Sequence, residues 1–262
     1  MSELRPERER VEDAGHAPSL MVRTASWLRL ALLGNLTPPS GGNDGLDAAK
    51  LIAIVLMVAS HTLSALPEPW RTTGYLIGRP CVPIFVFLIV TRLAHGGPER
   101  SARMFTRLLL WGIATQPIYY ALLGALTPRM NVLLTLAIGV ALVHCVRTSR
   151  YWLVALIVIV LPFRLDLLDG ATTPFAMLAG TLAFRESRAA ALAVAALAAA
   201  AENLLTPPLD WAAATATLVA APIILLSPRL ASNAPRLPGI LFYAVYPLHL
   251  LVIWIAFGSY RF

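Results

Sequence analysis

The sequence predicts an all-α fold, a polytopic bundle of transmembrane helices, and three observations support this fold class. Of the 262 residues, 58% are hydrophobic and only 13% are charged, whereas a soluble domain carries roughly 25% charged residues. From Leu46 onward the chain is a series of apolar runs, many of them near the ~20 residues that cross a membrane. The connections between these runs alternate between arginine-rich and acidic, as loops on opposite sides of a membrane do.

The first 45 residues are predicted to lie outside the spanning region. Residues 1–18 begin with alternating acids and arginines, which favours a disordered, solvated tail. Residues 19–45 place Trp27 and several leucines beside Arg29, a pattern typical of an amphipathic helix at the membrane surface, and end in a linker rich in Pro and Gly. Residues 46–262 are then the transmembrane domain.

Nine apolar segments follow, and we predict about nine spans from them. Two of them are short, and Pro162 and Pro174 flank the turn between them, so this pair is predicted to tilt or to be re-entrant. The nine segments are 47–66, 75–94, 104–126, 130–146, 151–163, 172–184, 189–205, 209–227 and 239–257.

The arginines predict the orientation of the bundle. Connections after the second, fourth, sixth and eighth segments carry arginine, whereas acids occur at three of the alternate connections: Glu68; Asp166 and Asp169; Glu202 and Asp210. Because positively charged loops stay cytoplasmic, the amino terminus is predicted inside and the carboxyl terminus outside.

Several other classes of protein and site are not favoured by the sequence. The net charge is +7, but the arginines are scattered and Lys50 is the single lysine, so no nucleic-acid-binding stripe is expected. Cys81 and Cys145 lie inside apolar runs and are predicted to be buried thiols without a disulfide. The histidines show no ligand spacing, and no metal site is expected.

Ionisable residues inside the predicted spans are the candidates for function, because burying such groups in a membrane is costly. Asp47, Lys50 and His61 share one face of the first span. At 1.5 Å per residue, His61 lies roughly 20 Å from the inner end, in the outer half of the membrane.

Two further candidates lie in other spans. Arg79 enters from the outside to a depth of about 6 Å, next to Pro80 and Pro83, which interrupt the helix. Arg79 and His61 are therefore predicted to share a level. His249 falls near the midplane, one turn beyond Tyr246.

These residue types fit acyl transfer. An imidazole in a dry cavity can take a proton from an attacking hydroxyl or amine, and a guanidinium can stabilise an oxyanion or hold an anion. A basic inner mouth could bind the phosphates of acyl-coenzyme A. Structural interpretations compete with this hypothesis, since a transmembrane His often bonds two helices and Asp47 with Lys50 could form an ordinary ion pair.

A family resemblance adds to this hypothesis. In order along the chain come LDAAKLIAIVLMVASHT, GRPCVPIFVFLIV, RLLLWGIATQPIYYAL, MNVLLTLAIGVAL and LFYAVYPLHLL. With these segments the sequence resembles the TraX family of conjugative-pilin acetylases from Leu46 to Trp254, and more distantly the membrane acyltransferase-3 group. Residues 151–235 match by hydropathy only.

The resemblance implies a function and a set of site residues. It implies N-acetylation of the amino terminus of a pilin subunit in the bacterial inner membrane, with acetyl-CoA as the donor. His61, His249 and Arg79 become the catalytic candidates, and the residues implied for binding substrate or donor are Asp47, Lys50, Gln116, Asn131 and Tyr246. Ser60 stands where the family commonly has an acid.

Other functions fit the same spans. An O-acyltransferase acting on a surface glycan would use the same base and donor. A non-catalytic assembly factor for a pilus or secretion complex would not need His61, and a small transporter would use the His and Arg to relay protons or bind an anion.

Overall fold

A computed structural model describes residues 46–123, 129–160, 172–184, 187–205, 210–230 and 239–259. These residues are almost entirely helical, which confirms the all-α prediction for this part of the chain. The tail at 1–18 and the interfacial helix and linker at 19–45 lie outside it. The helices are α2 (Leu46–Ser64), α3 (Trp70–Gly78), α4 (Cys81–Ala94), α5 (Pro98–Leu123), α6 (Val132–Arg147), α7 (Tyr151–Val160), α8 (Thr173–Ala183), α9 (Arg188–Leu205), α10 (Trp211–Leu218), α11 (Ala220–Leu230) and α12 (Gly239–Phe257).

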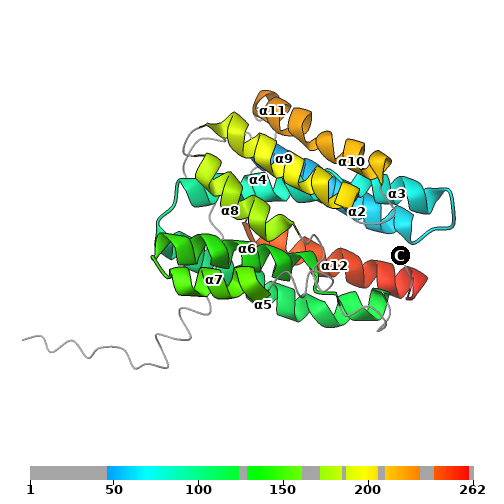
Figure 1. The fold of residues 1–262 in the computed structure, drawn as a ribbon. Helices are drawn as coiled ribbons and strands as arrows, with labels where there is room; N and C mark the ends of the chain where they lie inside the picture. The colour runs from blue at the N-terminus through cyan, green and yellow to red at the C-terminus, as the bar shows by residue number, and fades with distance from the viewer. Residues whose placement is uncertain are drawn as a thin grey trace, which may run out of the picture.

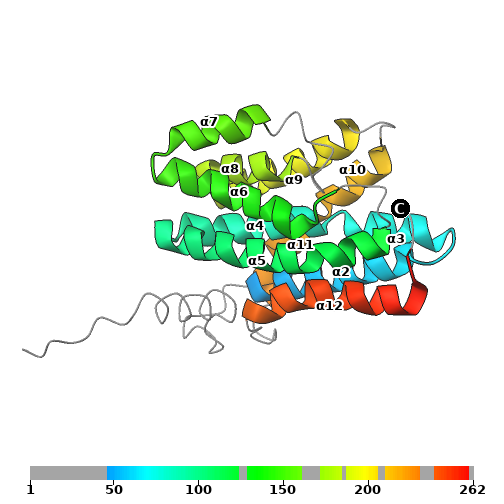
Figure 2. The same ribbon diagram turned by 90° about the horizontal axis from the view of Figure 1, so that it is seen from below.

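The helices lie side by side along a common direction (Figures 1 and 2). The centre of the bundle is α4, which packs against α2, α8, α9 and α11. Eleven of its fourteen residues are buried, all apolar except Thr91. By contrast α12 is predominantly apolar around its circumference, with His249 buried, and it leaves Leu248, Val252 and Ile255 exposed. A helix that is apolar all round and exposed on one side is suited to contact with lipid.

Three helical stretches are long and apolar enough to cross a membrane: α2, residues 70–94 through α3 and α4, and α12. Shorter apolar helices occur at Val132–Arg147, Thr173–Ala183, Ala189–Ala201 and Trp211–Leu226. The chain is thus an integral membrane protein by the length and composition of these helices. Nine complete crossings stay a prediction.

Two predicted segments are each divided into two helices. The second, expected at 75–94, begins earlier at Trp70 and is interrupted between Gly78 and Cys81, at Arg79 and Pro80. The eighth, expected at 209–227, is interrupted at Val219, just before Pro222. Proline removes a backbone donor and crowds the preceding turn, so each break has a local cause.

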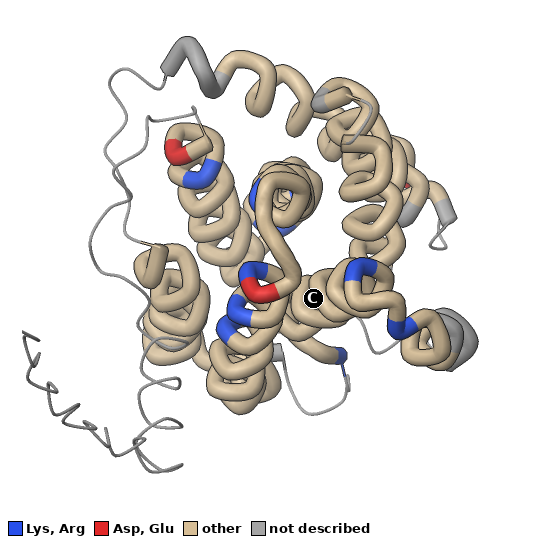
Figure 3. The backbone as a smooth tube through the Cα atoms, turned by 90° about the vertical axis from the view of Figure 1, so that its left-hand side faces the viewer, with Lys and Arg blue, Asp and Glu red and all other residues tan. Residues whose placement is uncertain are grey.

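The arginine-bearing connections gather at one end of the bundle. The α4–α5 and α6–α7 connections and the start of α2 lie there, and Figure 3 looks onto this end, where the blue of Lys and Arg predominates over red. Arg147 donates to the carbonyl oxygen of Gly96 at 2.7 Å and so joins two of these connections. We call this the arginine-rich end; the membrane orientation predicts that it faces the cytoplasm.

Small residues let α2 and α3 approach closely. A Cβ atom added to Gly74 would lie 2.7 Å from both Ser60 O and Ser64 N, and one added to Gly78 would lie 2.3 Å from Ser60 Oγ. Gly74 and Gly78 are four residues apart and therefore share one face of the helix. This small-residue contact fixes α3, and with it Arg79, beside the turn of α2 that carries His61.

Candidate functional site

The first and last described helices meet at a pair of histidines. His61 of α2 and His249 of α12 lie with Nδ1 of the former 2.6 Å from Nε2 of the latter. Their rings are parallel, with an interplanar angle of 1° and centroids 5.0 Å apart. His249 is only 8% exposed. The structure thus brings together two of the three predicted catalytic residues, which are 188 positions apart in the sequence.

The hydrogen bonds assign the protons of this pair. Nδ1 of His249 lies 2.8 Å from the carbonyl oxygen of Val245. A carbonyl only accepts, so this nitrogen carries a proton and Nε2 of a neutral His249 is an acceptor. His61 therefore donates its Nδ1–H to His249. When both histidines are neutral, the proton-accepting lone pair of the His61 ring is on Nε2. This nitrogen can therefore act as the general base.

Tyr246 lies against both histidines. Its ring is edge-on to each, with centroids 6.4 Å from His61 and 5.6 Å from His249. Its side chain is 2% exposed. This predicted binding residue therefore belongs to the histidine site.

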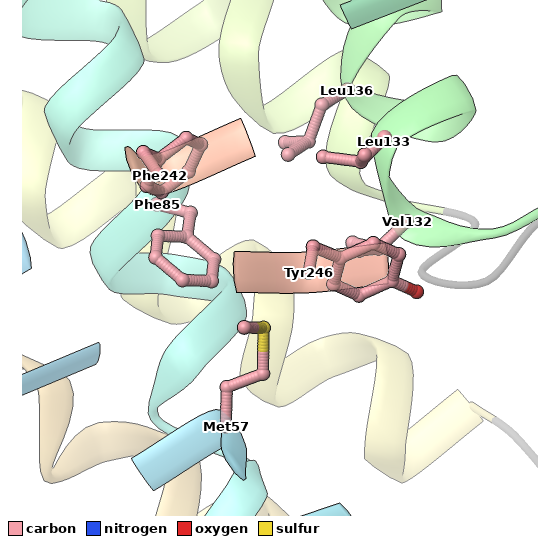
Figure 4. Close-up of a pocket in the computed structure, with 7 residues that line it drawn as sticks. All are labelled: Met57, Phe85, Val132, Leu133, Leu136, Phe242 and Tyr246. Carbon is pink, nitrogen blue, oxygen red and sulfur yellow. The ribbon is translucent and has the colours of Figure 1, made fainter. Parts of the chain in front are cut away.

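A small apolar pocket, with a cavity volume of about 10 Å³, begins one helical turn from the histidines. Met57 of α2, one turn before His61, and Tyr246 of α12 form the side nearest the pair. Figure 4 shows the Phe85 and Phe242 side chains facing Val132, Leu133 and Leu136 of α6 across this space. Apart from the tyrosine hydroxyl, the lining side chains are apolar.

Arg79 belongs to a different polar cluster. It donates to Oδ1 of Asn203 on α9 at 3.1 Å, and its guanidinium carbon lies 3.7 Å from the centre of the Tyr75 ring. Asn203 in turn donates to Thr217 of α10 at 3.1 Å. Among the residues that the structure describes, no carboxylate pairs with Arg79.

Arg79 and His61 lie at a similar level in the bundle but belong to different polar clusters. Gly78 packs against Ser60. Because Arg79 follows Gly78 in the chain and His61 follows Ser60, Arg79 and His61 are at the same height in the bundle. The polar contacts of Arg79 nevertheless lead to α9, and those of His61 lead to α12. The structure therefore separates the predicted catalytic set into two neighbouring polar clusters.

Gln116 and Asn131 form a clamp between α5 and α6. The Asn131 side chain accepts from the backbone N–H groups of Leu133 and Leu134, and donates to Gly112 O at 2.8 Å and to Gln116 Oε1 at 2.7 Å. Asn131 is fully buried. Its hydrogen-bonding capacity is thus used within the chain, in an arrangement that caps α6.

Asp47 and Lys50 form an ion pair in the first turns of α2. Lys50 is 4% exposed and lies within electrostatic range of Arg92 on α4. Arg92 and Arg107 both lie within electrostatic range of the Tyr243 hydroxyl on α12. The ion pair is therefore part of a larger basic group at the arginine-rich end.

Some residues of these clusters were not predicted from the sequence. Asn203 and Thr217 are single polar residues in segments that otherwise read as apolar, and Arg92 and Arg107 belong to the arginines from which only the orientation was predicted. The isolated Asn in the alanine-rich α9 was the available signal, because a buried amide needs a partner. No group of three or more His, Cys, Asp or Glu suited to a metal ion occurs in the described ranges.

The family model described as TraX protein matches residues 45–256. No curated protein and no solved structure matches the chain. The family match covers both histidines and the basic group, and agrees with the resemblance found in the sequence. The chain belongs to the TraX protein family.

Proposed function

We propose that this protein is a membrane-embedded acyltransferase that acetylates the amino-terminal amine of a pilin subunit, with acetyl-CoA as the donor. The observation that carries the proposal is the His61–His249 pair. It supplies a buried imidazole whose lone pair is directed to Nε2 by a defined chain of hydrogen bonds. Membership of the TraX family supports the choice of reaction.

In the proposed reaction His61 carries one proton from the attacking amine to the departing thiolate. Nε2 of His61 takes a proton from the attacking amine as its nitrogen bonds to the thioester carbonyl carbon. The carbon–sulfur bond then breaks, and the thiolate of coenzyme A receives the proton from His61. The products are the N-acetylated pilin and free coenzyme A. His249 acts as a positioning residue, because it holds His61 in the tautomer that leaves Nε2 basic.

The donor would enter from the arginine-rich end. Lys50, Arg92 and Arg107 place positive charge there, which suits the phosphates of coenzyme A. Lys50 is about 16 Å from His61 along α2 at 1.5 Å per residue, so an extended donor arm can connect the two. Asp47 orients Lys50 through the ion pair.

The remaining predicted residues support this site. Arg79 carries a charge that only neutral groups contact among the described residues, so it is the candidate to hold an anionic group of the acceptor in the outer half. Gln116 and Asn131 fix the start of α6, which forms one wall of the pocket. The pilin acceptor and the inner-membrane location are part of the proposal.

The test is the intact mass of a pilin co-expressed with the wild-type protein or with His61→Ala. We expect an acetyl-sized gain with the wild type and none with the variant, at equal protein level in the membrane. Leu248→Ala, at an exposed position of α12, is the control and should acetylate normally. A gain that survives His61→Ala would remove His61 as the base; no gain with the wild type would reject pilin acetylation and favour a glycan hydroxyl or a scaffolding role.

A further inference from the structure

The polar cluster around Arg79 lies on the opposite side of α2 from the histidine pair. Figures 1 and 2 both show α2 between α12 on one side and α9 with α10 on the other. The contacts agree, since α2 packs against α12 and α3, and α3 packs against α10. The reaction proposed above uses the histidine side and leaves the charge of Arg79 without an identified ligand.

The guanidinium of Arg79 is held in place by two uncharged groups. Its carbon lies 3.7 Å from the centre of the Tyr75 ring, and one of its nitrogens donates to Oδ1 of Asn203 at 3.1 Å. Asn203 is itself fixed, because it is 8% exposed and donates to Thr217 and to the carbonyl oxygen of Ala199. A guanidinium has five N–H donors in a planar fork. The two neighbours therefore orient a group that can bind an oxyanion through its other donors.

Two acids lie at the end of the bundle opposite the arginine-rich end, and both serve their own helices. Asp210 accepts from the backbone N–H of Ala213 at the start of α10, and Glu68 accepts from the backbone and hydroxyl of Thr72 on α3. No ion pair of Arg79 occurs among the side chains that the structure describes. A charge within a membrane bundle is costly unless it meets a partner, so an anionic ligand would stabilise this site.

The depth of the cluster favours a peptide over a lipid as the source of the anion. Trp70 and Trp211 are the first residues of α3 and α10 and are both largely exposed, as tryptophans at a membrane interface are. Tyr75, whose ring lies against the guanidinium, is roughly 7.5 Å further along the helix than Trp70 at 1.5 Å per residue. The guanidinium therefore lies below the interface and deeper than the phosphates of a lipid, where an inserted peptide can still reach it.

We infer that Arg79 binds the carboxylate of an acidic residue in the acceptor, about three to five residues after the amine that is acetylated. The inference rests on the proposed function and adds a determinant of acceptor specificity to it. The spacing follows from the geometry, because Arg79 and His61 are at the same height and their contacts lead to opposite sides of α2. A helix is about 10–12 Å across, and an extended peptide covers roughly 3.4 Å per residue.

A competition between peptides measures this specificity. Membranes that contain the protein receive acetyl-CoA and two acceptor peptides that differ only by Glu or Gln at one position, and the acetylated products are counted by mass. The pair is tested at each position from the second to the eighth. The product ratio compares kcat/KM for the two peptides and does not depend on how much protein folds.

We expect the wild type to favour Glu about tenfold at the fourth to sixth positions, as a hydrogen bond to a charged group does. Arg79→Gln should give a ratio near one at every position. Arg79→Lys retains the charge without the planar fork and should keep a smaller preference for Glu. The matched control is Arg71→Gln, because Arg71 is on the same helix but exposed, and this change should leave the wild-type ratio intact.

Each contrary result has a distinct meaning. If the wild type acetylates the Glu and Gln peptides equally, the assignment of Arg79 is overturned and the proposed function stands. If Arg79→Gln keeps the preference for Glu and Arg71→Gln loses it, a surface charge selects the acceptor, and the assignment is again overturned. If the peptides react equally and only the Arg79-containing protein gains activity from phosphatidylglycerol in vesicles, the ligand is a lipid phosphate and not the acceptor. If the wild type acetylates none of the peptides, the proposed function fails and the assignment fails with it.

Discussion

At the scale of single residues, the two histidines have unequal roles. His249 donates from Nδ1 to the carbonyl oxygen of Val245 and accepts at Nε2 from His61. The acid that the family commonly places before the first-span histidine is Ser60 here, and Ser60 faces Gly78 of α3. In this chain the hydrogen-bond acceptor for His61 is thus a second histidine from a distant helix.

This asymmetry predicts different effects for two substitutions of His249. His249→Ala removes the acceptor for the Nδ1–H of His61 and should lower the acetyl-transfer rate by about 100-fold, the lower range for losing acid–base assistance. His249→Gln retains a side-chain oxygen that can accept, and should keep a rate at least tenfold above that of the alanine variant. Initial rates in membranes of matched protein content measure both. Equal rates for the two variants would contradict the positioning role.

At the scale of helices, the contact between α2 and α3 depends on the absence of side chains at two glycines. The two positions differ in what an added methyl group would meet. At Gly74 it meets backbone atoms of Ser60 and Ser64, and at Gly78 it meets the Ser60 side chain. A side chain can be shortened by a second substitution, whereas backbone cannot.

The contact therefore predicts selective rescue. Gly74→Ala and Gly78→Ala should each destabilise the protein by about 1–3 kcal/mol, the usual cost of overpacking. Adding Ser60→Ala should restore most of the loss at Gly78, because it removes the oxygen 2.3 Å from the new methyl group, and should restore little at Gly74. Thermal unfolding midpoints in one detergent report all variants, with Ser60→Ala alone as the reference. Equal rescue at both glycines would show that the helices simply move apart.

At the scale of the whole molecule, the arginine-rich end gives the bundle a polarity (Figure 3). Two positions report its orientation. Gly97 lies in the α4–α5 connection of that end, with nothing within 4 Å of an added Cβ atom, and Ser259 follows α12 at the opposite end (Figure 1). The native Cys81 and Cys145 are both buried and should give little background.

The predicted orientation can be measured with a membrane-impermeant maleimide. A cysteine in place of Ser259 should react in spheroplasts, whereas one in place of Gly97 should react only after lysis, because arginine-rich loops stay cytoplasmic. Single substitutions with wild-type transfer activity are the valid reporters. Labelling of the Gly97→Cys variant before lysis would show that the orientation is the opposite of the predicted one. The proposed donor path would then open on the outer side of the membrane.

Much of this molecule could be predicted from hydropathy and single polar residues. The apolar segment at 239–257 coincides with α12, and the break at Arg79–Pro80 follows from proline chemistry. Which helices become neighbours was not predictable, because an apolar span can pack against any other apolar span. The partnership of His61 with His249, and of Arg79 with Asn203, depends on that packing and so required the structure.

The hydrogen bond between the first and last described helices has a consequence for biosynthesis. His249 is incorporated 188 residues after His61, after all the other described helices have been synthesised. A nascent or prematurely terminated chain can insert its early helices and bind lipid, yet it lacks the partner that sets the tautomer of His61. Activity would thus begin only after α12 has been made and has inserted beside α2, and fragments lacking α12 would remain inert in the membrane.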